Sequence, residues 1–254
     1  MSASERDPFF VGYLPVPGGL RVFLTAVAFF LFGGFVASAL LIGGTQDDPG
    51  DAAFRYDWGR QTLTGVLDAS PYPVLHVTRG TKRIPAGRTV LLSGNGKRGV
   101  QTRAAPLDGQ HVEISGVALK RGDIDMVQLR NGRNGLKKAD GAAQPASVEK
   151  LGRWRLSGEI CDGKCLSGAM RPGRGLSHRA CANFCLIGGI PPVFVSSAPV
   201  DGREFFLMAS RDGKTLGPDL LNHVAQYISV EGAIEKRGNI HVFMIDPSSV
   251  KMLP

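Results

Sequence analysis

The strongest hydrophobic pattern in the chain is an unbroken apolar stretch near its start. Residues 20–42 read LRVFLTAVAFFLFGGFVASALLI, and the single charge in this stretch, Arg21, lies at its edge. About 20 uncharged residues are enough for a helix to cross the core of a bilayer. A cleaved secretory signal has a shorter apolar region followed by a small-residue site, whereas the ASA at 37–39 lies inside the run. The pattern therefore predicts an uncleaved transmembrane anchor over 20–43, with a cleaved signal as the alternative.

Beyond this stretch, apolar and polar residues alternate in two segments that are similar to each other. Residues 112–129 read VEISGVALKRGDIDMVQL and residues 228–245 read ISVEGAIEKRGNIHVFMI, so the KRG of one aligns with the KRG of the other. Alternation with a period of two predicts strands, and the glycines at 122 and 238 mark tight turns between them. Each segment is therefore predicted to be a β-hairpin.

The segments that precede these hairpins also correspond. TLTGVLD from Thr62 and RLSGEICD from Arg155 each read as a strand that carries a glycine, which often marks a bulge or a bend in a barrel. We therefore expect a mainly β protein with two tandem, related small β-barrels of the five-stranded oligonucleotide/oligosaccharide-binding (OB) type. DLLNHVAQYI at 219–228 follows a proline and predicts a short helix, and GNGKRG at 94–99 predicts a turn.

Composition divides the chain into successive segments. Polar and acidic residues follow the apolar stretch, and a Gly-, Ala- and Lys-rich stretch separates the two β units. We predict a cytoplasmic tail over 1–19, the anchor over 20–43, a juxtamembrane linker over 44–57, a first OB-like β unit over 58–130, a linker over 131–150, and a second OB-like β unit over 151–254 with a Cys/His insertion over 161–189.

The charge pattern bears on location and partners. The formal net charge is +8, and the basic residues are spread along the chain rather than gathered in one run. Arg6 and Arg21 precede or edge the apolar stretch, whereas Asp47, Asp48 and Asp51 follow it, which favours a cytoplasmic N-terminus. We therefore expect a single-pass protein of the bacterial inner membrane with its main domain in the periplasm. An exported domain argues against nucleic acid and favours a membrane-protein or periplasmic protein partner, an anionic lipid or an anionic small molecule.

All four cysteines lie within residues 161–185, in CDGKCLSGAMRPGRGLSHRACANFC. The second β unit is longer than the first because it contains this stretch, so the stretch is an insertion into a barrel, where function often lies. Ser177 as N-cap and the Gly188-Gly189 pair as a stop predict a helix over 178–187. His178, Cys181 and Cys185 are spaced i, i+3 and i+7, so they line one face of that helix.

Four thiols and one imidazole make a soft ligand set that suits copper(I), zinc or an iron–sulfur centre. The spacing C-x3-C-x12-H-x2-C-x3-C departs from the common zinc pattern of C-x2-C pairs, so copper is preferred to zinc. The chain has no C-x-x-C-H, which excludes covalently bound c-type haem. The candidate metal ligands are Cys161, Cys165, His178, Cys181 and Cys185, with Met170 as an additional thioether.

Two other interpretations of the same cysteines stay open. In an oxidising compartment an even number of cysteines favours two disulfides, among Cys161, Cys165, Cys181 and Cys185, in any of three pairings. Alternatively, basic neighbours and a helix start lower the pKa of a thiol and favour thiol–disulfide exchange. The basic residues around the cluster, which also make a candidate anion- or partner-binding loop, are Lys164, Arg171, Arg174 and Arg179.

The segment LSGEICDGKC followed by LSHRACANFCLIGGIPP resembles a family of small exported bacterial β domains that are mostly uncharacterised. Their pattern is a strand with a glycine, a cysteine, His-x-x-Cys-Ala-x-x-Cys and a Gly-Pro turn. The matching positions in this chain are Gly158, Cys165 or Cys161, His178, Cys181, Ala182, Cys185, Gly189 and Pro191. The resemblance covers about 90 residues, from Trp154 to Ile245, and implies an extracytoplasmic β domain without implying an activity. This chain departs from the pattern by its second cysteine at 161, its Arg-rich loop and the preceding β unit.

The chain shows no recognisable catalytic arrangement: no Ser/His/Asp motif, no phosphate-binding loop and no conspicuous carboxylate pair. We therefore expect a non-enzymatic, membrane-anchored periplasmic accessory protein, a subunit or assembly factor of a membrane-bound respiratory or metalloenzyme complex. Its Cys/His cluster would bind copper or zinc or carry out thiol redox chemistry. The alternatives are a scaffold subunit stapled by two disulfides and a periplasmic thiol oxidoreductase.

Overall fold

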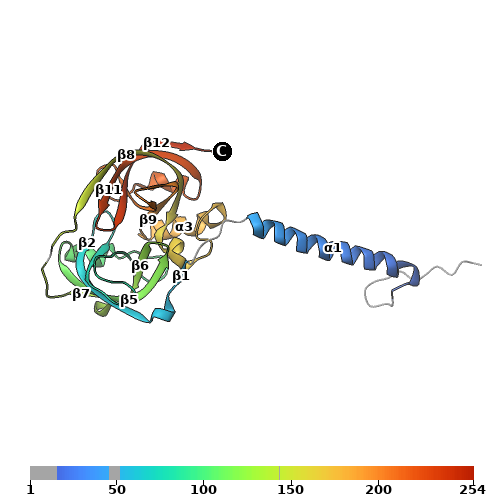
Figure 1. The fold of residues 1–254 in the computed structure, drawn as a ribbon, viewed down its shortest axis with the longest axis horizontal. Helices are drawn as coiled ribbons and strands as arrows, with labels where there is room; N and C mark the ends of the chain where they lie inside the picture. Colours follow the sequence, from blue (N-terminus) through green and yellow to red (C-terminus); the bar gives the residue numbers. More distant parts are fainter. Residues whose placement is uncertain (1–15, 46–51, 143) are drawn as a thin grey trace, which may run out of the picture. The chain divides into compact units, whose positions relative to one another are not determined.

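The structure, a computed structural model, describes residues 16–45, 52–142 and 144–254. The chain divides into two compact units, one within 1–48 and one within 49–254 (Figure 1). Most of the predicted cytoplasmic tail, with Arg6, and the acidic residues at 46–51 lie outside the described residues.

The first unit is a single helix, α1, which spans Gly18–Thr45. Its Gly18–Gly44 stretch is long and apolar enough to cross a membrane, and none of its most apolar window is buried. Large side chains such as Phe29, Phe32 and Phe35 are exposed, as they are in a helix whose solvent is lipid. The predicted apolar helix is confirmed. A signal sequence near an N-terminus passes the same test, so retention of the helix as an anchor stays a prediction.

The second unit is mainly β, and its N-terminal half is a sheet with strand order β1-β5-β2-β3-β4-β6. β5 also pairs with β6 and β7, and the β4–β6 pair is parallel. The elements of this half are β1 Ala53–Phe54, η1 Tyr56–Trp58, β2 Arg60–Asp68, β3 Val74–Arg79, β4 Thr89–Ser93, α2 Gln101–Ala104, η2 Ala105–Leu107, β5 His111–Arg121, β6 Ile124–Leu129, η3 Arg133–Gly135 and β7 Leu136–Lys138.

The C-terminal half is a closed barrel with strand order β10-β12-β11-β8-β9, in which β10 and β12 are parallel. Its interior is filled by large apolar side chains, among them Phe194, Phe206 and Phe243. The elements are β8 Val148–Asp162, the π-helix η4 Cys165–Ala169, η5 Leu176–His178, α3 Arg179–Ile187, β9 Pro192–Val200, β10 Arg203–Ser210, η6 Pro218–His223, β11 Tyr227–Arg237 and β12 Ile240–Met252.

Both predicted hairpins are present, as β5–β6 and β11–β12, with positive φ values of 52° at Gly122 and 59° at Gly238 in the turns. The glycines inside the first strands lie where a neighbouring backbone leaves no room for a side chain. A Cβ on Gly65 would be 2.1 Å from the carbonyl oxygen of His76, and one on Gly158 would be 2.0 Å from that of Val195. Sequence alternation and strand glycines therefore predicted these elements correctly.

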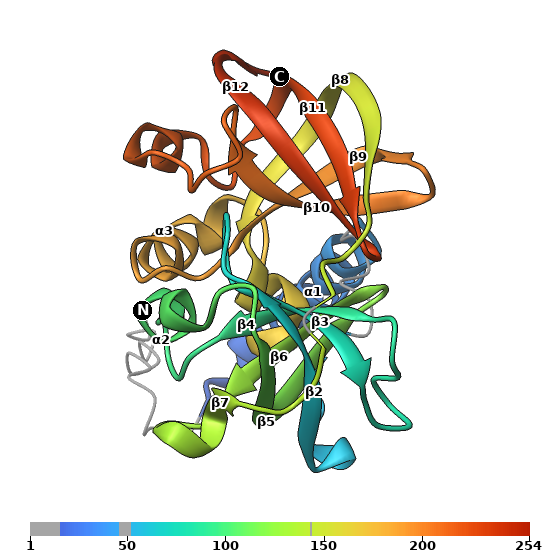
Figure 2. The same ribbon diagram turned by 90° about the vertical axis from the view of Figure 1, so that its left-hand side faces the viewer.

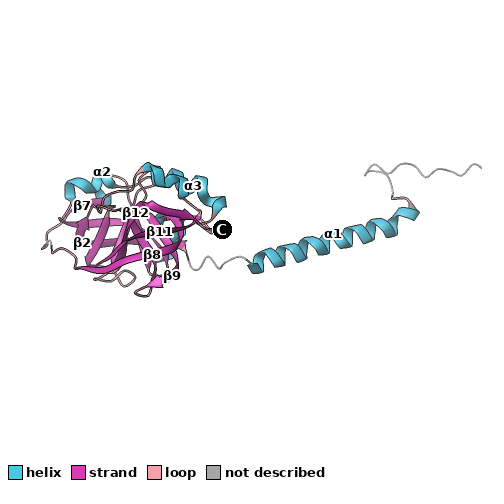
Figure 3. Ribbon diagram, turned by 90° about the horizontal axis from the view of Figure 1, so that it is seen from above, coloured by secondary structure: helices cyan, strands magenta, loops and turns pink. Residues whose placement is uncertain are grey.

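The two halves of the β unit pack against each other through one shared apolar cluster. Met126 of the first half and Val193 and Leu207 of the second belong to it. At its edge Arg203 forms an ion pair with Asp123 across the two halves. Figures 2 and 3 show α2 of the first half and α3 of the second on the same side of the strands. The halves thus share a continuous interface within one compact unit.

The prediction of a helix over 219–228 was wrong. Only Pro218–His223 is helical, as a short 3-10 helix, and β11 begins at Tyr227. Ala225 has a φ of +62°, a left-handed conformation that ends any helix, and Val224 forms a β-bridge with Ile160.

Parts of both predicted linkers are also ordered elements. β1 and the start of η1 lie within 44–57, and β7 and the start of β8 lie within 131–150. β1 and β7 pair with β5, and the start of β8 pairs with β11. Composition alone did not indicate these pairings. Ser177 is not the N-cap of α3, because it lies inside the 3-10 turn η5, and His178 occupies the N-cap position instead.

Candidate metal centre

The cysteine insertion connects β8 to β9 and is closed at its base by backbone hydrogen bonds. Gly163 N donates to Pro191 O at 2.8 Å, and Ile190 N donates to Cys185 O at 2.9 Å. Between these points the chain forms η4, which begins with Cys165, and α3, which carries Cys181 and Cys185. α3 ends at Gly188, and Gly189 with a φ of +88° turns the chain toward β9. The strand end and the helix therefore face each other.

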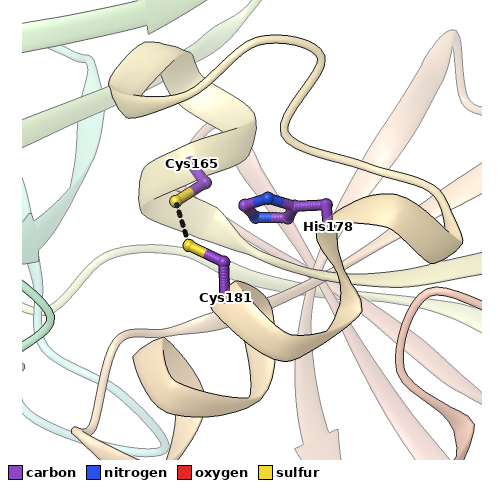
Figure 4. Close-up of side chains that lie close together, drawn as sticks. All are labelled: Cys165, His178 and Cys181. Carbon is purple, nitrogen blue, oxygen red and sulfur yellow. Dashed lines mark hydrogen bonds between the residues drawn. The ribbon is translucent and has the colours of Figure 1, made fainter.

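The Cys165 sulfur in η4 lies near the sulfurs of Cys181 and Cys185 in α3, and Figure 4 shows it facing Cys181 with His178 beside them. Cys165 Sγ lies 4.0 Å from Cys181 Sγ and 4.0 Å from Cys185 Sγ. A disulfide needs an S–S distance of about 2.05 Å, and all four cysteines, which are among the described residues, are free. A tetrahedral site with metal–sulfur bonds of about 2.3 Å places its sulfurs about 3.8 Å apart. The two separations from Cys165 are too long for a covalent bridge and close to the spacing of sulfurs on a metal.

His178 lies beside these sulfurs and is fixed by a buried carboxylate. Its Nε2 lies 3.1 Å from Asp162 Oδ2, while Asp162 Oδ1 accepts a hydrogen bond from Cys165 N at 2.8 Å. Both side chains are buried, His178 at 4% exposure and Asp162 at 0%. If Nε2 donates to the carboxylate, Nδ1 carries the lone pair that binds a metal, an arrangement common around metal-ligating histidines.

Two overlapping groups of potential ligand atoms result from this geometry. The ligand atoms of Cys165, His178 and Cys181 all lie within 4.8 Å of one another, as do those of Asp162, Cys165 and Cys185. Cys165 is common to both groups, so it lies at the centre of the cluster. The Cys181 thiol of α3 and the His178 imidazole of η5 therefore lie beside the Cys165 thiol of η4 without any movement of the backbone.

The thiols differ in their readiness to ionise. A hydrogen bond from Cys165 lowers the pKa of Cys185 below its ordinary value, and the Lys97 ammonium lowers it further. The same hydrogen bond, together with burial and Asp162, raises the pKa of Cys165 well above its ordinary value. Cys185 is therefore the favoured thiolate of this pair, with Cys165 as the protonated donor in the absence of a metal.

Cys161 does not join the other three cysteines. In β8 successive side chains point to opposite faces, so Ile160 faces the barrel interior while Cys161 packs into the apolar cluster between the two halves. Its Sγ donates to Glu159 Oε1 at 3.2 Å, and burial raises its pKa well above the ordinary value. Of the five predicted Cys and His ligands, Cys161 therefore belongs to neither group of neighbouring ligand atoms, whereas Cys165, His178, Cys181 and Cys185 each belong to at least one.

The four basic residues predicted to surround the cluster are each engaged within the protein. The buried Lys164 Nζ donates to the carbonyl oxygens of Gly94 and Gly96, both at 2.7 Å. Arg171 donates to Ala52 O and Arg179 to Asn222 O, each at 2.7 Å, and Arg174 lies 4.0 Å from Glu159. Met170 is 44% exposed. These contacts favour a structural role for the loop over anion binding.

Sequence reasoning missed two residues of this site, Asp162 and Lys97, and Lys97 comes from the turn at 94–99 in the first half. Its Nζ lies 2.6 Å from Cys181 Sγ and 3.8 Å from Cys185 Sγ. The predicted turn itself is confirmed, since Gly94 N donates to Arg98 O at 2.7 Å. Nothing local to the turn points to the cysteines, because the contact depends on the packing of the two halves.

The site therefore combines three thiols and one imidazole with a buried carboxylate behind the imidazole. This donor set is soft, and within it Cys165, His178 and Cys181 offer three ligand atoms that lie within 4.8 Å of one another. Comparison of the chain with protein-family models, with curated proteins and with solved structures gave no match.

Proposed function

We propose that this chain is a membrane-anchored accessory protein without catalytic activity of its own, which holds one copper(I) or zinc(II) ion at Cys165, His178, Cys181 and Cys185. The observation that carries the proposal is the convergence of the three sulfur atoms, with Cys165 Sγ 4.0 Å from each of the other two. Their separation is close to the edge of a thiolate tetrahedron around a metal.

The surroundings of the four ligands support a metal rather than an unliganded thiol cluster. Asp162 is buried and accepts from His178, and such carboxylate–histidine pairs orient a metal ligand and fix its tautomer. A buried carboxylate beside thiolates is unfavourable by itself, because like charges in a low-dielectric site repel each other. A cation at the centre of the cluster would remove that repulsion.

We further propose that the two halves of the β unit are related OB-like barrels. In the first half β2 pairs with β3 and β5, β3 with β4, and β4 with β6 in parallel. In the second half β8 pairs with β9 and β11, β9 with β10, and β10 with β12 in parallel. The same succession of pairings, with one parallel pair in the same place, supports a duplicated unit into which the cysteine segment was inserted.

The β unit is proposed to lie in the periplasm, anchored by α1 in the inner membrane, as a subunit or assembly factor of a membrane-bound respiratory or metalloenzyme complex. The charge difference across the apolar stretch supports this orientation. Leu176, Phe184 and Ile187 of the insertion are each more than 60% exposed, and large exposed apolar side chains favour a protein partner. Such a partner would receive the metal ion or be stabilised by it.

The test is metal content of the full-length protein in detergent, measured by mass after loading with copper(I) or zinc(II). Wild-type protein should bind one ion per chain. Cys161 and Cys185 offer a matched pair of variants, since both are buried, at 1% and 2% exposure. Cys161→Ala should retain one ion, whereas Cys185→Ala should lose affinity by about 100-fold, one ligand's share of a structural zinc site. Equal loss in both variants, or no metal in the wild type, would contradict the proposal.

Thiol redox chemistry is the second candidate, favoured by the unequal acidity of Cys165 and Cys185. A thiolate 4.0 Å from a thiol needs a shift of about 2 Å to become a disulfide. In glutathione buffers near the periplasmic redox potential, oxidised glutathione would accept the two electrons, and mass analysis would reveal a reversible loss of two hydrogen atoms. The two-disulfide scaffold is disfavoured because Cys161 lies in a different cluster from the other three cysteines.

A further inference from the structure

We infer that Lys97 is the gate of the metal site: its ammonium covers Cys181 and must move aside for an ion to enter or leave. The inference rests on the proposed function, because it assumes that the three thiols and His178 hold a metal. It adds a residue from the other half of the β unit, which controls the rate at which the ion exchanges.

The route by which an ion reaches the cluster is at Cys181. Cys165, Cys185 and His178 are buried, whereas Cys181 is partly exposed. An incoming ion, chelator or partner thiol therefore reaches the cluster through Cys181. In a ligand-exchange transfer, an acceptor thiolate would bind the metal and displace the most accessible ligand, which is the partly exposed Cys181.

Lys97 occupies this route. Its Nζ lies 2.6 Å from Cys181 Sγ and 3.4 Å from Cys181 O, while the side chain as a whole is exposed to solvent. Lysine carries its charge on a flexible stem of four carbons, so the ammonium can leave the sulfur without any movement of the backbone. A positive charge at this point also opposes the approach of a metal cation while it is in place.

The turn carrying Lys97 is held firmly against the cysteine insertion. Lys164, next to Cys165, donates to the carbonyl oxygens of Gly94 and Gly96, and Gly99 N donates to Gly188 O at 2.8 Å. A Cβ on Gly188 would be 1.8 Å from Lys97 O, so the two backbones touch. The backbone of the turn is therefore held in place, while the flexible Lys97 side chain can break its contacts with Cys181 by rotation about its own bonds, which is the arrangement that a gate requires.

The experiment measures zinc exchange in the full-length protein in detergent. Stopped-flow mixing with a coloured chelator gives the release rate, and mixing of metal-free protein with zinc gives the loading rate. Lys97→Met should raise both rates by about tenfold, equivalent to a barrier lower by about 1.4 kcal/mol, and leave the zinc dissociation constant within about threefold of wild type. Lys97→Arg should restore slow exchange. Arg98→Met, at the neighbouring exposed cation of the same turn, should exchange at the wild-type rate.

The outcomes separate the gate from the metal site. Wild-type protein that binds one zinc ion, with equal exchange rates in wild type and Lys97→Met, would overturn the gate and leave the proposed function standing. A changed melting temperature with unchanged rates, or a change in one rate alone with the matching change in the dissociation constant, would mean a structural role for Lys97 and would also overturn the gate. Absence of zinc from wild-type protein would overturn the proposed function, and the gate with it.

Discussion

The substitution Asp162→Asn tests the metal centre without removing any of its four ligands. Asp162 is fully buried and accepts two hydrogen bonds, from Cys165 N at 2.8 Å and from His178 Nε2 at 3.1 Å. Asparagine has nearly the same shape but replaces one acceptor oxygen with an NH2 donor. In either orientation of the amide, this NH2 faces one of the two N–H groups. The backbone N–H of Cys165 cannot change, so His178 must adapt.

The adaptation removes a metal ligand. With the amide NH2 pointing at it, Nε2 of His178 becomes an acceptor, and the ring proton moves to Nδ1, the nitrogen proposed to bind the metal. Loss of such an orienting partner lowers metal affinity by about 10- to 100-fold, or about 1.4 to 2.8 kcal/mol. An independent limit is similar: a structural zinc site of about 12 kcal/mol shared by four ligands gives about 3 kcal/mol for each ligand.

The assay is a competition titration of zinc between a chelator and the full-length protein at pH 7. Nitrogen NMR of the metal-free protein reports the His178 tautomer directly. Asp125→Asn is the matched control, because Asp125 is also buried, at 4% exposure, but pairs with Arg88 and Lys120 away from the cluster. The control should lose stability and keep its zinc affinity. Wild-type affinity together with an unchanged tautomer in Asp162→Asn would refute the assignment of His178 as a ligand.

Three further predictions concern the packing, the pH dependence and the metal. Gly188→Ala should lower the free energy of unfolding by about 2 kcal/mol in denaturant titrations, because its Cβ would lie 1.8 Å from Lys97 O. Gly217→Ala is the control: nothing lies within 4 Å of its Cβ, so it should change the free energy of unfolding by less than about 0.5 kcal/mol. Burial lowers the pKa of His241, so the unfolded state binds a proton at this side chain more readily than the folded state. The free energy of unfolding should therefore fall as the pH drops below about 6.5. Urea titrations at several pH values should show a smaller change of the free energy of unfolding with pH in His241→Gln. Removal of zinc from loaded protein by a chelator should lower the melting temperature by about 5 to 10 °C, because zinc at 100 times its dissociation constant stabilises the folded state by about 2.7 kcal/mol. An unchanged melting temperature would contradict specific binding.

Local sequence patterns predicted those elements whose cause is local. The alternation in β11 and β12 and the glycine at 238 were sufficient for the hairpin, because strand period and turn conformation are set within a few residues. The end of α3 at Gly188 was predicted for the same reason. The apolar spacing at 219–228 misled because Leu220, Val224 and Ile228 are all buried, as in a helix, although a left-handed residue and a strand intervene.

The composition of the site was only partly predictable. The separation of Cys161 from the cluster follows from the alternation of β8, because Ile160 is an interior residue and the next side chain must point outward. That inference was available from the sequence once the end of the strand was placed at Asp162. Lys97 was not predictable, because 84 positions separate it from Cys181 and only the packing of the two halves brings them together.

The two halves of the β unit contribute different parts of the proposed metal site, and this difference has a physical reason. All four proposed ligands lie within 165–185, so the chain closes the metal site as a short local loop with a small loss of conformational entropy. A local loop by itself leaves its thiols open to solvent and to the wrong ion. The first half supplies what the loop lacks, namely carbonyl oxygens for the buried Lys164 and an ammonium over Cys181. In the proposed metal site, affinity would be set by the insertion and exchange by the interface, so different substitutions should change the two properties.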